Sequence, residues 1–157
     1  MIIKKILIAV DNSKFSEHAA EFGFDIARSY NAAVGLVNIV EPMILPATGT
    51  DVIAGIPFEG TTVNDPEITR IQTESAENII DRTEKKFGGN LQVTHFTQYG
   101  TTAEGILDCS KEFEADLVVL GTHSRTGLDR LLMGSVAEHV VRHSDVPVLV
   151  VPLRDEG

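Results

Sequence analysis

Five short strand-like segments alternate with segments of helical periodicity, and this alternation constrains the fold more than any other feature of the chain. Four of them are apolar runs, at residues 6–10, 33–40, 116–120 and 146–151, and residues 91–98 alternate between apolar and polar. Strands that alternate with helices predict a parallel sheet with helices on both faces and right-handed crossovers. Continuous apolar runs are typical of strands buried on both faces. We therefore predict an open five-stranded α/β fold in a single domain, residues 1–157.

Four helices are predicted between these strands from their caps and apolar spacing. Ser13 can cap a helix over 14–30, and Asp65 followed by Pro66 opens a second helix that ends at Gly88. The apolar side of the first helix is predicted from residues spaced three to four apart: Phe15, Ala19, Phe22, Ile26 and Tyr30. The third and fourth helices follow two predicted capping boxes, Thr101 with Glu104 and Ser135 with Glu138.

Residues 41–65 break every period, because prolines and glycines recur throughout the segment. A loop of this length in a compact domain is usually functional or mobile. We predict that it is a long mobile loop and a candidate lid.

The charge and cysteine content exclude several classes of protein. The formal net charge is −10, which argues against duplex nucleic acid or an anionic membrane as the main partner. Cys109 is the single cysteine, so an intramolecular disulfide cannot form. The N-terminal apolar stretch is too short for a signal peptide and no run approaches a transmembrane span, so we expect a cytoplasmic protein.

The carboxyl ends of the first, second and fourth strands are the predicted binding site, because open α/β sheets bind ligands where the strand order reverses. After the first strand, Ala9 and Val10 lead to Asp11, which can accept from ribose hydroxyls, form an Asx turn, or do both. The strand edge at Ile39 or Val40 can pair with the edge of an adenine base.

The glycine-punctuated segment 121–135 joins the fourth strand to the fourth helix and is the predicted phosphate site. It starts at Leu120 and Gly121 and ends at Gly134, Ser135 and Val136, where a helix N-terminus can face an anion. Inside it, backbone N–H groups that include that of Ser124 can reach phosphate oxygens, and Arg125 and Arg130 can neutralise charge. His123 either contacts phosphate or simply closes the strand end.

These features together resemble the universal stress protein family over nearly the whole chain. The matching blocks are residues 6–11, 99–106, 115–123, 131–143 and 147–151. ATP-binding members of that family carry Gly-x2-Gly-x9-Gly-(Ser/Thr), and here Gly121, Gly134 and Ser135 match while Ser124 replaces the second glycine. The resemblance implies an adenine nucleotide alpha hydrolase-like fold with strand order 3-2-1-4-5. It also implies ATP binding and a homodimer in which the last strand, Val146 to Val151, pairs antiparallel with its copy.

The predicted function is a nucleotide-dependent regulator or switch in the stress response. Phosphoryl transfer needs positioned charge and an in-line nucleophile. The chain has no Gly-x4-Gly-Lys-(Ser/Thr) loop, no lysine in the phosphate segment and no evident catalytic base, so we expect no enzyme activity beyond very slow ATP hydrolysis. Mg²⁺ or Mn²⁺ can be held by the phosphates and the Ser135 hydroxyl, and no metal site made of protein ligands alone is predicted.

Other interpretations stay open at the level of sequence. The chain can be a dimeric interaction module that no longer binds nucleotide, with Ser124 as the sign of that loss. An adenylating or ATP-cleaving enzyme would show turnover well above background. A receiver domain is disfavoured, because residues 95–100 lack the acceptor aspartate that such a domain needs. His139 and His143 have metal-binding spacing, but a solvated helix face explains them better.

Overall fold

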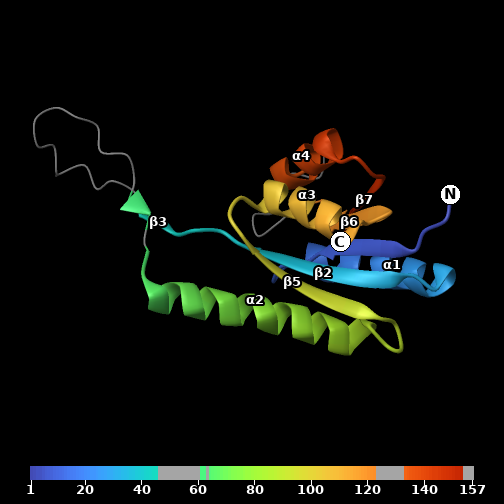
Figure 1. Ribbon diagram of the computed structural model, residues 1–157, viewed down its shortest axis with the longest axis horizontal. Coiled ribbons are helices and arrows are strands. Elements are labelled where there is room, and N and C mark those ends of the chain that lie inside the picture. Colours follow the sequence, from blue (N-terminus) through green and yellow to red (C-terminus); the bar gives the residue numbers. More distant parts are fainter. Residues whose placement is uncertain (46–60, 63, 123–132, 154–157) are drawn as a thin grey trace, which may run out of the picture.

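Five parallel strands form the main sheet in the spatial order β5-β2-β1-β6-β7 (Figure 1). This computed structural model describes residues 1–45, 61–62, 64–122 and 133–153. The predicted order 3-2-1-4-5 is confirmed, since β5 is the third strand of this sheet along the chain. The strands are β1 (Lys5–Ala9), β2 (Ala33–Val40), β5 (Val93–Tyr99), β6 (Leu117–Gly121) and β7 (Val148–Val151).

Two pairs of helices cover the two faces of this sheet. One apolar cluster packs α1 (Lys14–Tyr30) and α2 (Pro66–Phe87) against one face, and a second packs α3 (Thr102–Phe113) and α4 (Ser135–His143) against the other. Successive residues of β1 serve opposite clusters: Ile6 and Ile8 belong to the first and Leu7 to the second. Each such fully buried aliphatic side chain contributes about 1.5–3 kcal/mol of transfer free energy.

Helix α1 has the predicted bounds, but the prediction of its buried side is wrong in part. Phe22 and Tyr30 are 47% and 54% exposed, whereas Gly23 and Phe24 face the sheet. A Cβ atom at residue 23 would lie 2.6 Å from the Ile8 Cδ1 atom. The helix lies so close to β1 at this position that a larger residue at 23 would displace the Ile8 side chain. The helical spacing of large apolar residues does not reveal this close approach.

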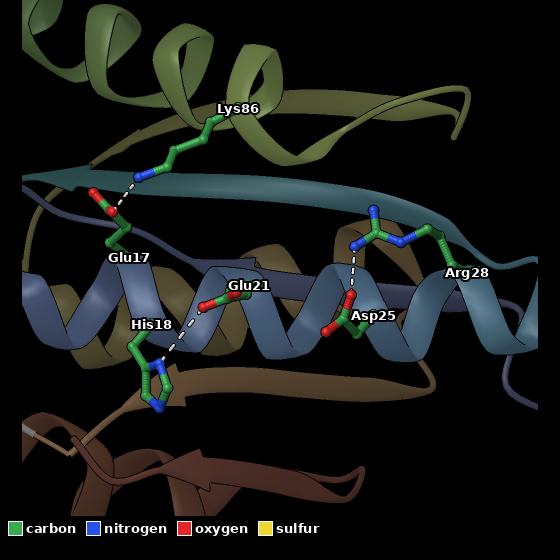
Figure 2. Close-up of polar contacts among 6 residues, drawn as sticks. All are labelled: Glu17, His18, Glu21, Asp25, Arg28 and Lys86. Atoms are coloured by element: carbon green, nitrogen blue, oxygen red, sulfur yellow. Dashed lines mark hydrogen bonds and ion pairs between the residues drawn. The ribbon is translucent and has the colours of Figure 1, made fainter. Parts of the chain in front are cut away.

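Polar contacts join α1 and α2 along their exposed sides (Figure 2). Lys86 of α2 pairs with Glu17 of α1, and the Arg28 guanidinium donates to the Phe87 carbonyl at 2.8 Å. Arg28 also pairs with Asp25 on its own helix. Exposed ion pairs contribute little free energy, so the apolar clusters rather than these contacts hold the two helices on the sheet.

The predicted caps of α1 and α2 are confirmed. The Ser13 side chain accepts from the Ser16 N–H at 3.1 Å, and the Asp65 side chain accepts from the Glu67 N–H at 2.9 Å. Helix α2 ends where Gly88 takes the cap position.

Both predicted capping boxes are wrong. At α3, Thr101 makes no side-chain cap, and Glu104 instead contacts His139 of α4, with 2.6 Å between Oε1 and Nε2. The carboxylate of Glu41 accepts from the Thr102 N–H at 3.1 Å and from its hydroxyl at 2.5 Å, so a residue distant in sequence caps this helix.

At α4 the cap residue is Gly134 and no side chain caps the helix, since Ser135 is already its first residue. Glu138 pairs with Arg142 one turn further on, at 2.8 Å, and is therefore not turned back towards the start of the helix.

The segment predicted as one long loop contains a short antiparallel pair, β3 (Ile44–Leu45) with β4 (Thr61–Thr62). Residues 46–60 and 63 lie outside the described residues, so the predicted mobility of this segment stays a prediction.

The central strand β1 joins the two halves of the chain. It pairs with β2 on one side and with β6 on the other, where Ile6 lies opposite Leu117. The Asp116 carboxylate accepts from the N–H groups of Lys4 and Lys5 at 2.8 and 2.9 Å. None of the helices in the described part of the chain is long and apolar enough to cross a membrane.

Candidate functional site

A cleft of about 630 Å³ opens at the carboxyl ends of β1, β2 and β6, which is the predicted edge of the sheet. Its size lies within the range of small-molecule sites, roughly 300–1,000 Å³. Every predicted binding residue that the structure describes lines this cleft: Ala9, Val10, Asp11, Ile39, Val40, Leu120, Gly121, Gly134, Ser135 and Val136. The predicted residues His123, Ser124 and Arg125 lie outside the described residues.

Two glycines stand at the ends of the connection between β6 and α4. A Cβ atom on Gly121 would lie 2.8 Å from the Phe15 carbonyl oxygen, so glycine is needed there for the close approach of α1. Gly121 is the last residue of β6. Gly134 has φ −56° and ψ 153°, a backbone conformation that other residues can adopt.

The N-terminus of α4 borders the cleft without a side-chain cap. The first N–H groups of a helix have no intrahelical partner, and the helix dipole adds the equivalent of about half a positive charge at this end. Ser135 is exposed at the first position of the helix, so its hydroxyl is accessible together with these N–H groups. This end of the cleft is therefore suited to an anion.

The turn after β1 holds Asp11, which also lines the cleft. Its Oδ1 atom accepts from the Ser13 N–H at 2.8 Å, which confirms the predicted Asx turn. The Asp11 N–H donates to the Ser16 hydroxyl oxygen at 2.7 Å, and the Asn38 side-chain amide donates to the Val10 carbonyl at 2.8 Å.

Sequence reasoning missed Ser16 as a residue of the cleft, and it placed Asn38 at the end of the second strand without assigning it a role. Asn38 carried a usable signal, since it is the only polar residue in the otherwise apolar run 33–40. Ser16 carried none, because a serine near the start of a helix is common for reasons of capping alone.

The two residues that were predicted to offer a strand edge, Ile39 and Val40, differ in the direction of their main-chain groups. The Val40 carbonyl accepts from the Gly100 N–H at 3.0 Å, so its main-chain groups face β5. Backbone groups alternate along a strand, and the Val37 carbonyl accepts from the Val10 N–H at 2.9 Å on the β1 side. Ile39 therefore directs its N–H and C=O beyond the end of β1 into the cleft, and Val40 does not.

A wall formed by α2 was not predicted from the sequence. Its apolar part includes Ile71, which is 55% exposed and offers a surface for a flat ring. The charged side chains among the described lining residues are Asp11 and Glu41, and none of those lining residues is lysine or arginine. Among these lining residues, the groups suited to an anion are therefore backbone N–H groups and hydroxyls such as that of Ser135, and not cationic side chains.

Two other sequence features lie away from the cleft. His139 contacts Glu104 and stacks on His143 at 4.2 Å between ring centroids, on an exposed side of α4. The described residues contain no cluster of three or more potential metal ligands. Cys109 is fully buried in α3, and burial together with the negative charge of Glu112 raises the pKa of its thiol to about 12.

Comparison with known proteins identifies relatives over nearly the full length of the chain. The model of the Universal stress protein family matches residues 3–152. A universal stress protein of Methanocaldococcus jannaschii is 31% identical over 150 residues, which cover 96% of this chain and 82% of that protein.

Solved structures of this family share the fold. A universal stress protein in complex with cAMP has a TM-score of 0.68 at 22% identity, covering 96% of this chain and 98% of that chain. The universal stress protein from Archaeoglobus fulgidus in complex with dAMP has a TM-score of 0.60 at 22% identity, with the same coverage of both chains.

Proposed function

The chain belongs to the universal stress protein family, and from this premise we propose that its cleft binds an adenine nucleotide, with ATP as the preferred ligand. The observation that carries the proposal is the convergence of three different groups on one cleft. These groups are the Asp11 carboxylate, the main-chain edge of Ile39 and the uncapped N-terminus of α4. They are complementary to a ribose, a base edge and a phosphate chain. Two fold relatives that were solved with adenine nucleotides, cAMP and dAMP, support the choice of base.

In this proposal each part of the nucleotide has a defined partner. The adenine edge pairs with the N–H and C=O of Ile39 and lies on the apolar surface of Ile71. Asp11 accepts from the ribose hydroxyls with the oxygen that the Asx turn leaves available. The phosphates lie at Gly134 and Ser135, where backbone N–H groups and the Ser135 hydroxyl donate to them.

A divalent cation is part of the proposed complex. A triphosphate brings several negative charges to a cleft whose charged, described lining residues are both acidic, Asp11 and Glu41. Mg²⁺ or Mn²⁺ prefers phosphate and hydroxyl oxygens, and the Ser135 hydroxyl can complete its ligands. The cation would enter with the nucleotide rather than occupy a site of its own.

We propose that the protein acts as a nucleotide-dependent regulator in the cytoplasm and not as an efficient enzyme. Among the described residues that line the cleft, none is a histidine or a lysine that could serve as a base or stabilise a leaving phosphate. Bound ATP would therefore persist, and its presence or absence would set the state that a partner recognises.

We also propose that the protein is a homodimer joined through β7. Among the described strands, β7 is the edge strand of the main sheet next to β6, and its side chains are half-buried except for that of Val151, which is buried. An apolar strand at the edge of a sheet is normally covered or paired, and a second copy of the same strand can pair with it.

Isothermal titration of the purified protein with ATP, with and without Mg²⁺, tests nucleotide binding. We expect saturable binding that is tighter with Mg²⁺. The absence of both a heat signal and a thermal shift at millimolar ATP would reject the proposal. Mass spectrometry of gently purified protein would then distinguish a different co-purified nucleotide from an interaction module that binds none.

A further inference from the structure

Two buried polar side chains hold one peptide group, the one between Val10 and Asp11, from opposite sides. The Asn38 Nδ2 atom donates to its carbonyl at 2.8 Å, and its N–H donates to the Ser16 Oγ atom at 2.7 Å. The C=O and N–H of a trans peptide point in opposite directions. The two hydrogen bonds therefore fix the rotation of this peptide plane about the chain direction.

Ser16 and Asn38 are buried, unlike most of the polar residues that the structure describes. Ser16 is 5% exposed and Asn38 is 9% exposed, and Ser110 is the only other buried polar residue in the described part of the chain. Burying a polar group costs free energy unless it is hydrogen-bonded. The neighbours of Asn38 in β2 and of Ser16 on the inner side of α1 are mostly apolar. Sheet and helix packing alone would be satisfied by apolar residues at both positions.

The peptide that they hold leads into Asp11, one of the two acidic residues among the described residues that line the cleft. Asp11 lines the cleft, and the Ser13 N–H already engages its Oδ1 atom. The main chain of Asp11 is thus fixed by Ser16 and Asn38 and its side chain by Ser13. An acceptor held in this way loses little conformational freedom when a ligand binds, which is the general advantage of preorganisation.

We propose that Ser16 and Asn38 are positioning residues, which hold the Asp11 carboxylate where it accepts from the two ribose hydroxyls of a bound nucleotide. This inference rests on the proposed function, since it assigns the ribose part of the same site. It predicts that the two residues affect recognition of the sugar and leave recognition of the base and phosphates nearly unchanged.

The decisive readout is the ratio of affinities for ATP and for 2′,3′-dideoxy-ATP, both with Mg²⁺, measured by titration calorimetry. We expect the unaltered protein to prefer ATP. Ser16→Ala should reduce that preference about tenfold, which corresponds to the loss of one well-placed hydrogen bond to a charged group. Asn38→Leu should act in the same direction, and Ser16→Thr, which keeps the hydroxyl, should retain the preference.

Ser110→Ala is the matched control, because it removes an equally buried serine hydroxyl from α3, on the other face of the sheet. It should leave the ATP to dideoxy-ATP ratio unchanged. In an Asp11→Ala background, Ser16→Ala should also have no further effect on the ratio, since residues that act through one another are not additive. Thermal unfolding of every variant establishes that it is folded.

Different outcomes overturn different statements. If Ser16→Ala weakens ATP and dideoxy-ATP by the same factor, the residue is only structural and the inference is wrong. Equal affinities of the unaltered protein for the two ligands would overturn it without any variant. If the unaltered protein binds neither ligand, the proposed function fails and the inference fails with it.

Discussion

The Gly134 N–H donates to the Thr122 carbonyl at 2.7 Å, and this hydrogen bond joins the end of β6 to the start of α4. Both residues line the cleft, so the bond sets how far the helix N-terminus lies from the strand end. The proposed phosphate site depends on this separation.

Replacing Gly134 with valine should abolish ATP binding and leave the fold intact. The φ and ψ angles of Gly134 are accessible to valine, but a branched side chain would occupy the space proposed for phosphate. We expect a stability loss of about 1 kcal/mol, because valine is a poor N-cap residue. Calorimetry and thermal unfolding measure the two effects, and Gly134→Ala should be intermediate in affinity. Unchanged ATP affinity in the valine variant would contradict the phosphate position.

Removing divalent cations should weaken ATP binding much more than AMP binding. The charged, described lining residues, Asp11 and Glu41, are acidic, and ATP carries more negative charge than AMP. Titrations of both nucleotides with Mg²⁺ and with EDTA measure the difference. Equal sensitivity of the two ligands would show that cations act on the protein rather than on the phosphates.

Glu41→Ala should destabilise the protein by about 1 kcal/mol, the usual cost of losing a helix cap. The Glu41 carboxylate accepts twice from Thr102 at the start of α3, whereas Thr101 makes no side-chain cap. Thr101→Ala is the control and should change the free energy of unfolding by less than about 0.5 kcal/mol. Urea unfolding of both variants measures these changes. If Thr101→Ala is the more destabilising of the two, Glu41 is not the cap of α3.

The buried Cys109 thiol should make the protein less stable as the pH rises from 9 towards 12. Burial, and then the charge of Glu112, raises the pKa of this thiol from 9.0 to about 12. In that window the unfolded state loses the thiol proton and the folded state keeps it, so ionisation favours unfolding. The free energy of unfolding should fall by about 1.4 kcal/mol per pH unit in this window, because one proton is lost on unfolding.

Urea unfolding at several pH values, for the unaltered protein and for Cys109→Ala, isolates this contribution. The variant is less stable at neutral pH because of the cavity it creates, but the other titrating groups are common to both proteins. The difference between their free energies of unfolding should therefore shrink above pH 9. A constant difference would show that the thiol does not titrate as stated.

Val150→Pro should convert the proposed dimer into a monomer that is still folded. The Pro147 carbonyl accepts from the Val118 N–H of β6, and the Val151 carbonyl accepts from the N–H of Thr122, the residue after β6. By alternation, the Val150 N–H points away from β6. Proline is tolerated on the free side of an edge strand but cannot donate to a new neighbour. Sedimentation measures the mass of the protein in solution and so distinguishes the monomer from the dimer. Leu149→Pro, which removes an N–H that faces β6, should instead lower the unfolding temperature.

Most element boundaries followed from the sequence because they depend on local patterns, whereas the strand order was implied by the family resemblance. The run 33–40 and the helix 14–30 have the predicted bounds, since both are flanked by strong local signals. The inner side of α1 was less predictable, because contact with the sheet selects Gly23 and leaves Phe22 exposed. Helical periodicity reports hydrophobicity and not the distance between layers.

The residues of the cleft that lie at strand ends or in a glycine motif were predictable from the sequence. The side-chain contacts between distant segments were not. The strand ends and Gly134 were found, because topology alone brings them to one edge. The cap that Glu41 provides for α3 and the contacts of Asn38 with Val10 connect segments 61 and 28 residues apart. Capping rules consider only neighbouring residues, which is why Thr101 and Ser135 were assigned roles that they do not have.

The pairing of β1 with both β2 and β6 has a consequence for biosynthesis. A nascent chain that has left the ribosome only as far as α3 contains β1 and its first neighbour, but the other edge of Ile6 to Ile8 has no partner until β6 follows. Strand β6 also supplies residues Leu120 and Gly121 of the cleft, so the cleft is incomplete until β6 has left the ribosome. One edge of the central strand therefore stays without its partner during most of translation.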